Sequence, residues 1–219
     1  MKYYILTMIG IVEILIIAVI LIFSIILHEI AHGMAAYAMG DSTAKDMGRL
    51  SLNPIRHIDP FGSIVLPGIL LLTNLLSGVN DFVIGWAKPV PVNPSNFRDK
   101  RYGDAKVSLA GPGVNLLIAL IFGLALRIFF LKSHNIPEGT VMVFVYIVQI
   151  NIILAVFNLI PLPPLDGSHI LFTFLPKSFD QLKIFLIRYG MIILLAIIIF
   201  FGNYISLLSN WVFKLIVGL

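Results

Sequence analysis

The chain has 219 residues, of which 59% are hydrophobic and 12% are charged, and its formal net charge is +4. Soluble domains carry about 25% charged residues, so this composition excludes a soluble globular protein and predicts an integral membrane protein. The absence of cysteine excludes disulfides, cysteine-ligated zinc sites and a thiol nucleophile.

The first predicted element is a long transmembrane helix at the N-terminus. Its apolar run extends from Tyr3 to Ile26 without a small-residue cleavage site, so we expect no removable signal peptide. The helix formers of AHGMAAYAM extend the helix to Met39, and Gly40 followed by Asp41 ends it. Such a helix is about 50 Å long and exceeds the hydrocarbon core of about 30 Å, so one end must protrude or the helix must tilt.

Two histidines and a glutamate lie near the end of this helix, in the segment HEIAH. His28 and His32 are four residues apart, so both imidazoles project from one helix face and can bind one Zn²⁺. Glu29 lies about 100° around the helix, where it can reach a water molecule on the metal without being a ligand. The alternative is a capping or packing role, but ionisable residues at membrane depth are rare and usually functional. We therefore expect a metal site here.

Residues 61–79 form an apolar segment that glycines and a proline interrupt. The segment lies within residues 40–106, which hold eight of the fifteen basic residues. Positively charged loops stay in the cytoplasm, so this region crosses the membrane an even number of times. We expect a re-entrant segment, with two crossings as the alternative. Because membrane topology explains the positive charge, we expect no nucleic-acid partner.

Hydropathy predicts three further spans and one shorter apolar segment of open status: residues 105–131, 140–160, 182–201 and 204–217. A second basic group, Lys177, Lys183 and Arg188, lies before and within the third of these segments and belongs in the cytoplasm. The predicted fold class is an all-α polytopic membrane protein, a helical bundle of about four to six transmembrane segments. Residues 1–219 are expected to form a single membrane-embedded domain.

The best donor for a third zinc ligand lies in the segment NLIPLPPLDGSHIL. Asp166 is the only acidic residue between Glu138 and Asp180, and it follows three prolines that end the preceding helix. Irregular backbone at membrane depth is tolerated only inside protein or along a wet cavity. The alternative is that Asp166 caps the next helix, but a cap does not require a broken apolar segment before it. We therefore favour a metal ligand.

The motifs HEIAH, AGPGVN and NLIPLPPLDG, in this order along essentially the whole chain, resemble those of the site-2 protease family. These are zinc metalloproteases that cut peptide bonds within membranes. The resemblance implies one Zn²⁺ per chain, held by His28, His32 and Asp166. It implies Glu29 as the catalytic residue and Asn158 as a contact of the substrate backbone. It also implies a small membrane-associated β element after the first helix, for which TAKDMGRLSLNP is available.

The same resemblance implies a transmembrane protein or peptide as the substrate, within the lipid bilayer. The cell membrane is the expected location, with the active site towards the cytoplasmic side. LDGSH departs from the family where many members have a second glycine, so His169 carries no implied role. No PDZ-like or nucleotide-sensing domain is recognisable in the sequence. A membrane metal transporter and a metal-dependent hydrolase of lipids or small amides are the alternative functions.

Two further polar residues receive structural interpretations. Asn115, in AGPGVN, is a polar group on an apolar helix and is interpreted as an interhelical hydrogen bond rather than a catalytic group. Gly111 and Gly113 beside it suit close helix packing. His57, in NPIRHIDPFG, is interpreted as part of the loop structure.

Overall fold

The computed structural model describes residues 2–77, 85, 87–132 and 137–218. Every regular element in these residues is a helix, so the predicted all-α class is confirmed for the described chain. The elements, with η marking short 3₁₀ or π helices, are α1 (Lys2–Ala38), α2 (Thr43–Asp46), η1 (Pro54–His57), η2 (Pro60–Val65), α3 (Leu66–Ser77), η3 (Pro94–Asn96), α4 (Gly103–Lys132), α5 (Glu138–Asn158), α6 (Asp166–Phe174), η4 (Lys177–Phe179) and α7 (Asp180–Val217).

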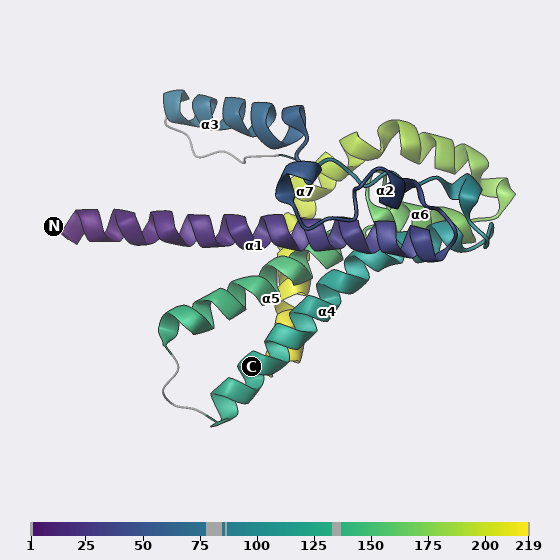
Figure 1. The fold of residues 1–219 in the computed structure, drawn as a ribbon. Helices are drawn as coiled ribbons and strands as arrows, with labels where there is room; N and C mark the ends of the chain where they lie inside the picture. Colours follow the sequence, from purple (N-terminus) through teal and green to yellow (C-terminus); the bar gives the residue numbers. More distant parts are fainter. Residues whose placement is uncertain (1, 78–84, 86, 133–136, 219) are drawn as a thin grey trace.

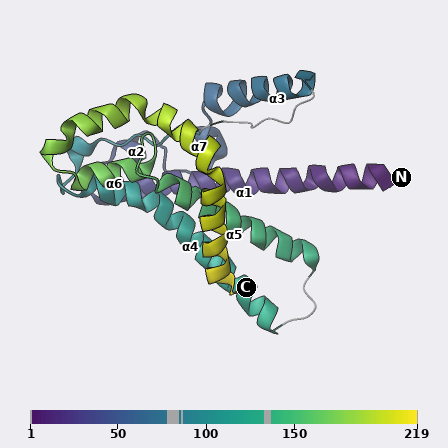
Figure 2. The same cartoon turned by 180° about the vertical axis from the view of Figure 1, so that it is seen from behind.

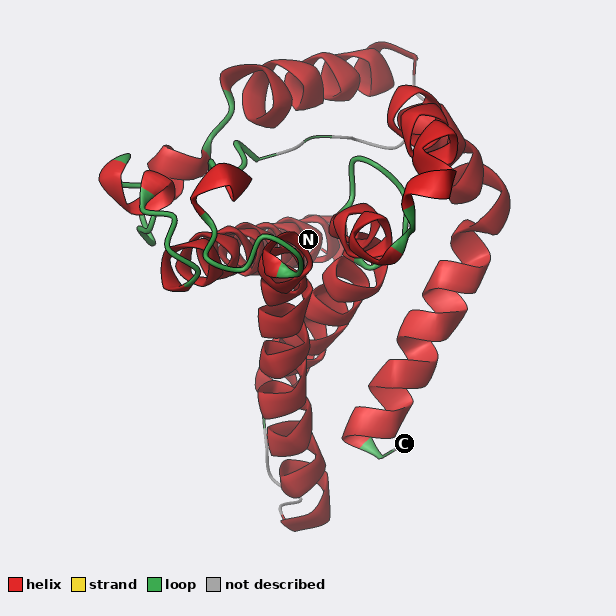
Figure 3. Cartoon of the chain, turned by 90° about the vertical axis from the view of Figure 1, so that its right-hand side faces the viewer, coloured by secondary structure: helices red, strands yellow, loops and turns green. Residues whose placement is uncertain are grey.

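Four helices among the described residues are long and apolar enough to cross a membrane, within the predicted range. These candidate spans are Gly10–Ala38, Gly103–Ile128, Glu138–Asn158 and Lys177–Val217. The last of them unites two segments that the sequence left separate, residues 182–201 and 204–217. Both belong to the continuous helix α7, which bends along its length (Figures 1 and 3). The chain is therefore a polytopic membrane protein.

Helix α4 is the centre of the bundle, where it packs against α1, α5, α6 and α7 (Figure 1). A buried apolar cluster joins α4, α5 and α7 and consists of Ala119, Leu126, Val148, Ile152 and Val217. A second cluster, of Ala36, Phe97 and Val107, joins the end of α1 to the start of α4. These contacts hold the C-terminal part of α1 close to α4, and α6 packs against the same helix.

The small β element expected after α1 is not found among the described residues. Its segment, residues 43–54, forms α2 and an irregular loop instead. The backbone N–H of Gly48 donates to Lys45 O at 2.9 Å, and that of Arg49 donates to Ala44 O at 2.8 Å. Gly48 has φ +63°, a left-handed conformation that ends a helix. Local turn formation therefore uses the backbone donors that a strand ladder would need.

The apolar segment after η1 leaves the bundle and returns to the same place. Helix α3 lies apart from the other helices (Figures 1 and 2). The backbone N–H of Lys88 donates to His57 O at 2.9 Å, so the chain after the excursion lies beside its starting point. Helices η2 and α3 form one continuous helical stretch over the described residues 60–77. The return of the chain to its starting point fits an even number of crossings, as expected for residues 40–106.

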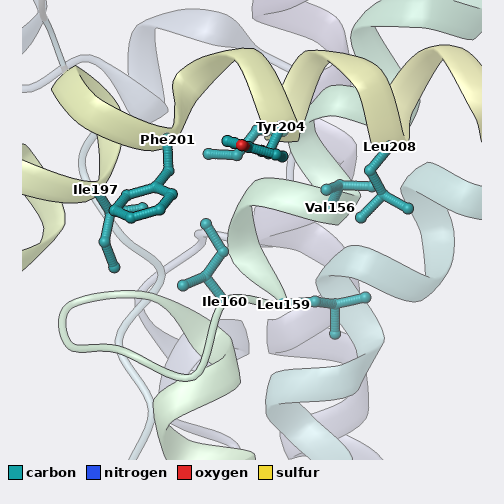
Figure 4. A pocket seen from close by; sticks show the side chains of 8 residues that line it. Val156, Leu159, Ile160, Ile197, Phe201, Tyr204 and Leu208 are labelled. Carbon is teal, nitrogen blue, oxygen red and sulfur yellow. The ribbon is translucent and has the colours of Figure 1, made fainter.

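An apolar groove lies between the end of α5 and α7 (Figure 4). Its side chains are Val156, Leu159, Ile160, Ile197, Phe201, Tyr204, Ile205 and Leu208. Large apolar side chains are also exposed on the outer faces of all four long helices. Such surfaces suit hydrocarbon rather than water, so the C-terminal half of α7 belongs to the membrane-spanning bundle.

Candidate metal centre

Three predicted ligands meet where α1 faces the start of α6. Nε2 of His28 lies 3.1 Å from Oδ2 of Asp166, although the two residues are 138 positions apart in the chain. Nε2 of His32 lies 3.3 Å from the same oxygen, and the two Nε2 atoms lie 3.0 Å apart. In the described part of the chain, this trio forms a group that could hold a metal ion.

The spacing of these atoms fits tetrahedral zinc. Zinc binds imidazole nitrogen and carboxylate oxygen at about 2.0–2.2 Å, so neighbouring ligand atoms of a tetrahedral site lie about 3.3 Å apart. The three observed separations are 3.0, 3.1 and 3.3 Å. Three protein ligands also leave a fourth position for water or substrate, as catalytic zinc sites require.

The hydrogen bonds of the imidazole rings also call for a cation. Nδ1 of His32 lies 2.8 Å from Val107 O, and a carbonyl only accepts, so Nδ1 carries the hydrogen. The neutral ring then presents the lone pair of Nε2 to Asp166. Nδ1 of His28 lies 2.6 Å from Oδ1 of Asn115, so that His28 has the same arrangement. Two lone pairs and a carboxylate that face one another repel unless a cation lies between them. The residues present therefore fit a zinc ion.

Gly111 of α4 leaves room for the predicted ligands His28 and His32. A Cβ atom at this position would lie 2.4 Å from Nε2 of His32 and 2.5 Å from Nε2 of His28. A Cβ atom at Gly113 would meet no atom within 4 Å. The two glycines, which the sequence interpreted alike, thus differ: Gly111 keeps α4 clear of the imidazoles of His28 and His32.

The cap alternative for Asp166 does not match the geometry. Asp166 is the first residue of α6, and the N-cap position belongs to Leu165, which has no side-chain cap bond. Gly167 allows the close approach that brings α6 to the site, because a Cβ atom there would lie 2.4 Å from the carbonyl oxygens of both Leu159 and Ile160. The carboxylate of Asp166 thereby points at the two histidines.

Glu29 lies at the edge of the same pocket and is held by a loop. Its Oε2 accepts a hydrogen bond from the backbone N–H of Val90 at 2.7 Å. Arg49 holds this loop in turn, because its Nη2 donates to Lys88 O at 2.7 Å and to Pro89 O at 3.2 Å. The loop therefore holds one oxygen of the Glu29 carboxylate, and Glu29 is not one of the three residues of the candidate metal group.

The remaining wall of the pocket includes Asn158 and a third histidine, His169. Asn158 donates through Nδ2 to Leu154 O of its own helix at 2.9 Å, so its amide is turned back towards α5. His169 lies with Nδ1 3.0 Å from Oδ2 of Asp104, and this carboxylate raises the pKa of His169. His57, by contrast, lies 2.7 Å through Nε2 from Ser51 O and belongs to the loop structure.

Three residues of this region were not identified from the sequence. Val90 acts through its backbone N–H, so its side chain gives no signal. Ser24 and Asn151 are buried polar residues in apolar spans, at 4% and 1% exposure. Their occurrence at membrane depth was the available signal, because polar groups there usually have a specific partner.

Known proteins resemble this chain. The model of Peptidase family M50 matches residues 128–198. "Putative zinc metalloprotease YwhC" of Bacillus subtilis is 37% identical over 190 residues, which cover 84% of this chain and 81% of that protein. "Putative zinc metalloprotease Rip2" of Mycolicibacterium smegmatis is 29% identical over 194 residues, 88% of this chain and 68% of that protein. No solved structure matches the chain.

Proposed function

Because the chain belongs to peptidase family M50, the site-2 protease family of intramembrane zinc metalloproteases, we propose that His28, His32 and Asp166 bind its zinc ion. Glu29 is the catalytic residue in this proposal. The observation that carries it is the meeting of three ligand atoms from α1 and α6 within 3.3 Å, at a spacing that suits zinc. One zinc ion per chain is proposed, because the described residues hold one such ligand group.

The proposed chemistry divides between the ion and the side chains. When bound, zinc polarises the scissile carbonyl and makes the attacking water more acidic. Oε1 of Glu29 takes a proton from that water, while Oε2 keeps its hydrogen bond to Val90 N–H. The carboxyl group then delivers the proton to the leaving amine. Such general acid–base catalysis contributes about 10²–10⁴-fold in rate.

Asn158 is the proposed contact of the substrate backbone. It lies in the pocket wall with Glu29 and the ligands, at the last residue of α5. Its present partner, Leu154 O, belongs to its own helix and can also bond within that helix. The amide of Asn158 can therefore turn to a peptide group of an unwound substrate, to which it offers both a donor and an acceptor.

We propose that the substrates are membrane proteins, cut within or near a transmembrane segment. The ligands of α1 belong to an apolar span, and His28 lies ten residues, or about 15 Å, before the end of that helix. The connection from the C-terminal end of α1 to the N-terminal end of α4 holds seven of the fifteen basic residues. Under the positive-inside tendency, the proposed location is the cell membrane with the site towards the cytoplasm.

The alternative functions gain no support from the described residues. A transporter needs metal ligands along a path across the bilayer. The candidate ligands found among the described residues are the three of one group, at one depth. No observation favours a hydrolase of lipids or small amides over a peptidase.

The test is reconstitution of the purified protein in liposomes with a labelled transmembrane peptide, with zinc content measured by mass spectrometry. We expect Glu29→Gln to keep zinc and to lose at least about 10²-fold in turnover. Asp166→Ala is expected to lose zinc and turnover together. A chelator is expected to abolish cleavage, and added zinc to restore it.

The matched control is Glu13→Gln. Glu13 lies on the same helix as Glu29, but its carboxylate accepts a hydrogen bond from the Tyr146 hydroxyl and does not line the pocket. We expect this variant to keep both zinc and turnover. Full cleavage by Glu29→Gln, or full zinc content in Asp166→Ala, would contradict the proposed roles.

A further inference from the structure

Three polar residues form a buried cluster inside the apolar bundle, next to the metal centre. Ser24 on α1, Asn115 on α4 and Asn151 on α5 are 4%, 0% and 1% exposed. Polar groups buried among apolar side chains are costly unless they are hydrogen-bonded. We call these three residues the amide relay, because hydrogen bonds connect them in one direction to His28.

The relay begins at a backbone carbonyl that fixes the amide of Asn151. Nδ2 of Asn151 lies 2.8 Å from Ile147 O and 2.9 Å from Ser24 Oγ. A carbonyl oxygen only accepts, so the group facing Ile147 must be the NH₂ end of the amide. Oδ1 of Asn151 is therefore the end that faces Asn115.

The same reasoning fixes the amide of Asn115. Its Nδ2 donates to Oδ1 of Asn151 at 2.8 Å and to the backbone carbonyl of Ser24 at 3.3 Å. Both partners accept, so an inverted amide would place oxygen against oxygen twice. Oδ1 of Asn115 must then face Nδ1 of His28, which lies 2.6 Å away.

We propose that the amide relay locks the tautomer of His28 and so makes its Nε2 a metal ligand. Oδ1 of Asn115 only accepts, so Nδ1 of His28 carries the single hydrogen of the neutral ring. Nε2 is left without a hydrogen, facing His32 and Asp166 at 3.0 and 3.1 Å. Asn115 and Asn151 are thus positioning residues of the zinc site. The inference rests on the proposed function, because it takes His28 as a ligand.

Both histidines carry their hydrogen on Nδ1, but the acceptors of the two Nδ1–H groups differ in kind. His32 donates to the backbone carbonyl of Val107, which substitution of a side chain does not remove. His28 depends on a side-chain amide, whose two ends have opposite hydrogen-bonding roles. An unsupported amide at position 115 could invert and leave the hydrogen on Nε2. The relay therefore makes the orientation of Asn115 a property of three helices, α1, α4 and α5.

The first test observes the tautomer directly in zinc-free protein. Histidine is labelled with ¹⁵N, the protein is kept in detergent micelles at about pH 8, where a free imidazole is neutral, and the His28 signals are assigned by their loss in His28→Gln. We expect wild-type His28 to carry its hydrogen on Nδ1, and Asn115→Leu to shift it partly or wholly to Nε2. A wild-type hydrogen on Nε2 would overturn the proposal.

The second test measures zinc affinity by competition with a coloured chelator. Loss of such an outer partner typically costs 10–100-fold in metal affinity, and we expect about this loss for Asn115→Leu. Asn151→Leu removes the oxygen that accepts from Asn115 but leaves Asn115 in place, so it is expected to give a smaller loss than Asn115→Leu. Unchanged affinity in Asn115→Leu would overturn the proposal, as would unchanged affinity in Asn151→Leu.

Two serine variants distinguish an effect on the His28 tautomer from a general effect on helix packing. Ser24 and Ser209 are both buried serines, at 4% and 5% exposure, but Ser209 bonds to Ile205 O within its own helix. Ser24→Ala removes one of the two acceptors of Asn151 Nδ2 but keeps Ile147 O and its own backbone carbonyl, so it is expected to weaken zinc binding less than Asn151→Leu. Ser209→Ala is expected to leave zinc binding unchanged. If wild type bound no zinc, the proposed function would fail, whereas the tautomer measurement would still decide the relay. If Asn115→Leu did not fold, Asn151→Leu, which leaves Asn115 in place, would supply the decision.

Discussion

The backbone N–H of Val90 donates to Oε2 of Glu29 at 2.7 Å, across 61 residues of sequence. Val90 stands between Pro89 and Pro91, and a residue before proline is held extended. Arg49 donates hydrogen bonds to the carbonyls of the two residues before Val90, Lys88 and Pro89. A loop of restricted conformation thus sets the direction of the proposed catalytic carboxylate, and neither partner is near the other in the sequence.

Val90→Pro tests this relationship, because proline has no backbone N–H. We expect the variant to keep its zinc and to lose about 10–100-fold in turnover, since the carboxylate is no longer held for proton transfer. Zinc content and peptide cleavage in liposomes are the measurements. Val92→Pro is the control in the same segment, because Val92 does not donate to Glu29. Equal losses in both variants would contradict a specific role of the Val90 N–H.

Gly111→Ala is expected to prevent zinc binding. The new methyl group would lie within 2.5 Å of Nε2 of both His28 and His32, so the rings would have to move away from Asp166. Gly113→Ala adds the same methyl two residues later, where no atom lies within 4 Å, and is expected to keep zinc and activity. Zinc content of the two purified variants is the measurement. Normal zinc content in Gly111→Ala would be inconsistent with this placement of α4.

Gly167→Ala is expected to disturb the position of Asp166. The added Cβ would lie 2.4 Å from the backbone oxygens of Leu159 and Ile160, which cannot rotate away as a side chain does. Overpacking of this kind costs about 1–3 kcal/mol in the free energy of unfolding. We expect lower zinc affinity together with this loss, measured by chelator competition and by unfolding in detergent. Gly202→Ala, with no atom within 4 Å, is the control.

Asp41 links the end of α1 to the loop before α4 and gives a pH prediction. Its carboxylate accepts from Thr43, from Asn93 N–H at 2.7 Å and from Asn96 Nδ2 at 2.8 Å. Burial alone would raise the pKa of Asp41, but these hydrogen bonds outweigh it and hold the pKa below its usual value. Because the pKa is lower in the folded state, ionised Asp41 stabilises the fold above its ordinary pKa. That contribution disappears as the pH falls through the lowered value.

Asp41→Asn is therefore expected to reduce the free energy of unfolding by about 1.5–3 kcal/mol at neutral pH, the usual worth of hydrogen bonds to a charged group. The difference from wild type should shrink as the pH falls below the ordinary pKa of aspartate, about 3.9. The measurement is the free energy of unfolding of wild type and variant in denaturing detergent, at neutral pH and at a pH below about 3.9. Asp46→Asn, at an exposed position, is the control for loss of charge. A difference that does not depend on pH would argue against this origin.

The sequence by itself determined that the chain lies in a membrane. It also determined the positions of most transmembrane spans and one part of the candidate site. Hydropathy and helix periodicity depend on near neighbours along the chain, so the first helix, its HEIAH segment and the spans that became α4 and α5 could be predicted. The spacing of His28 and His32 on one helix face follows from the geometry of a single helix. The break before Asp166 follows from proline chemistry alone.

Only the tertiary structure decided which distant groups meet. Asp166 reaches His28 over 138 residues, and Asn115 faces His28 because α4 packs against α1. The two roles of Gly111 and Gly113, the contact of Val90 with Glu29 and the turn that replaced the expected β element likewise depend on packing or on local hydrogen bonds. Contacts between helices are set by shape and by the satisfaction of buried polar groups over the whole bundle, and no short window of sequence contains that information.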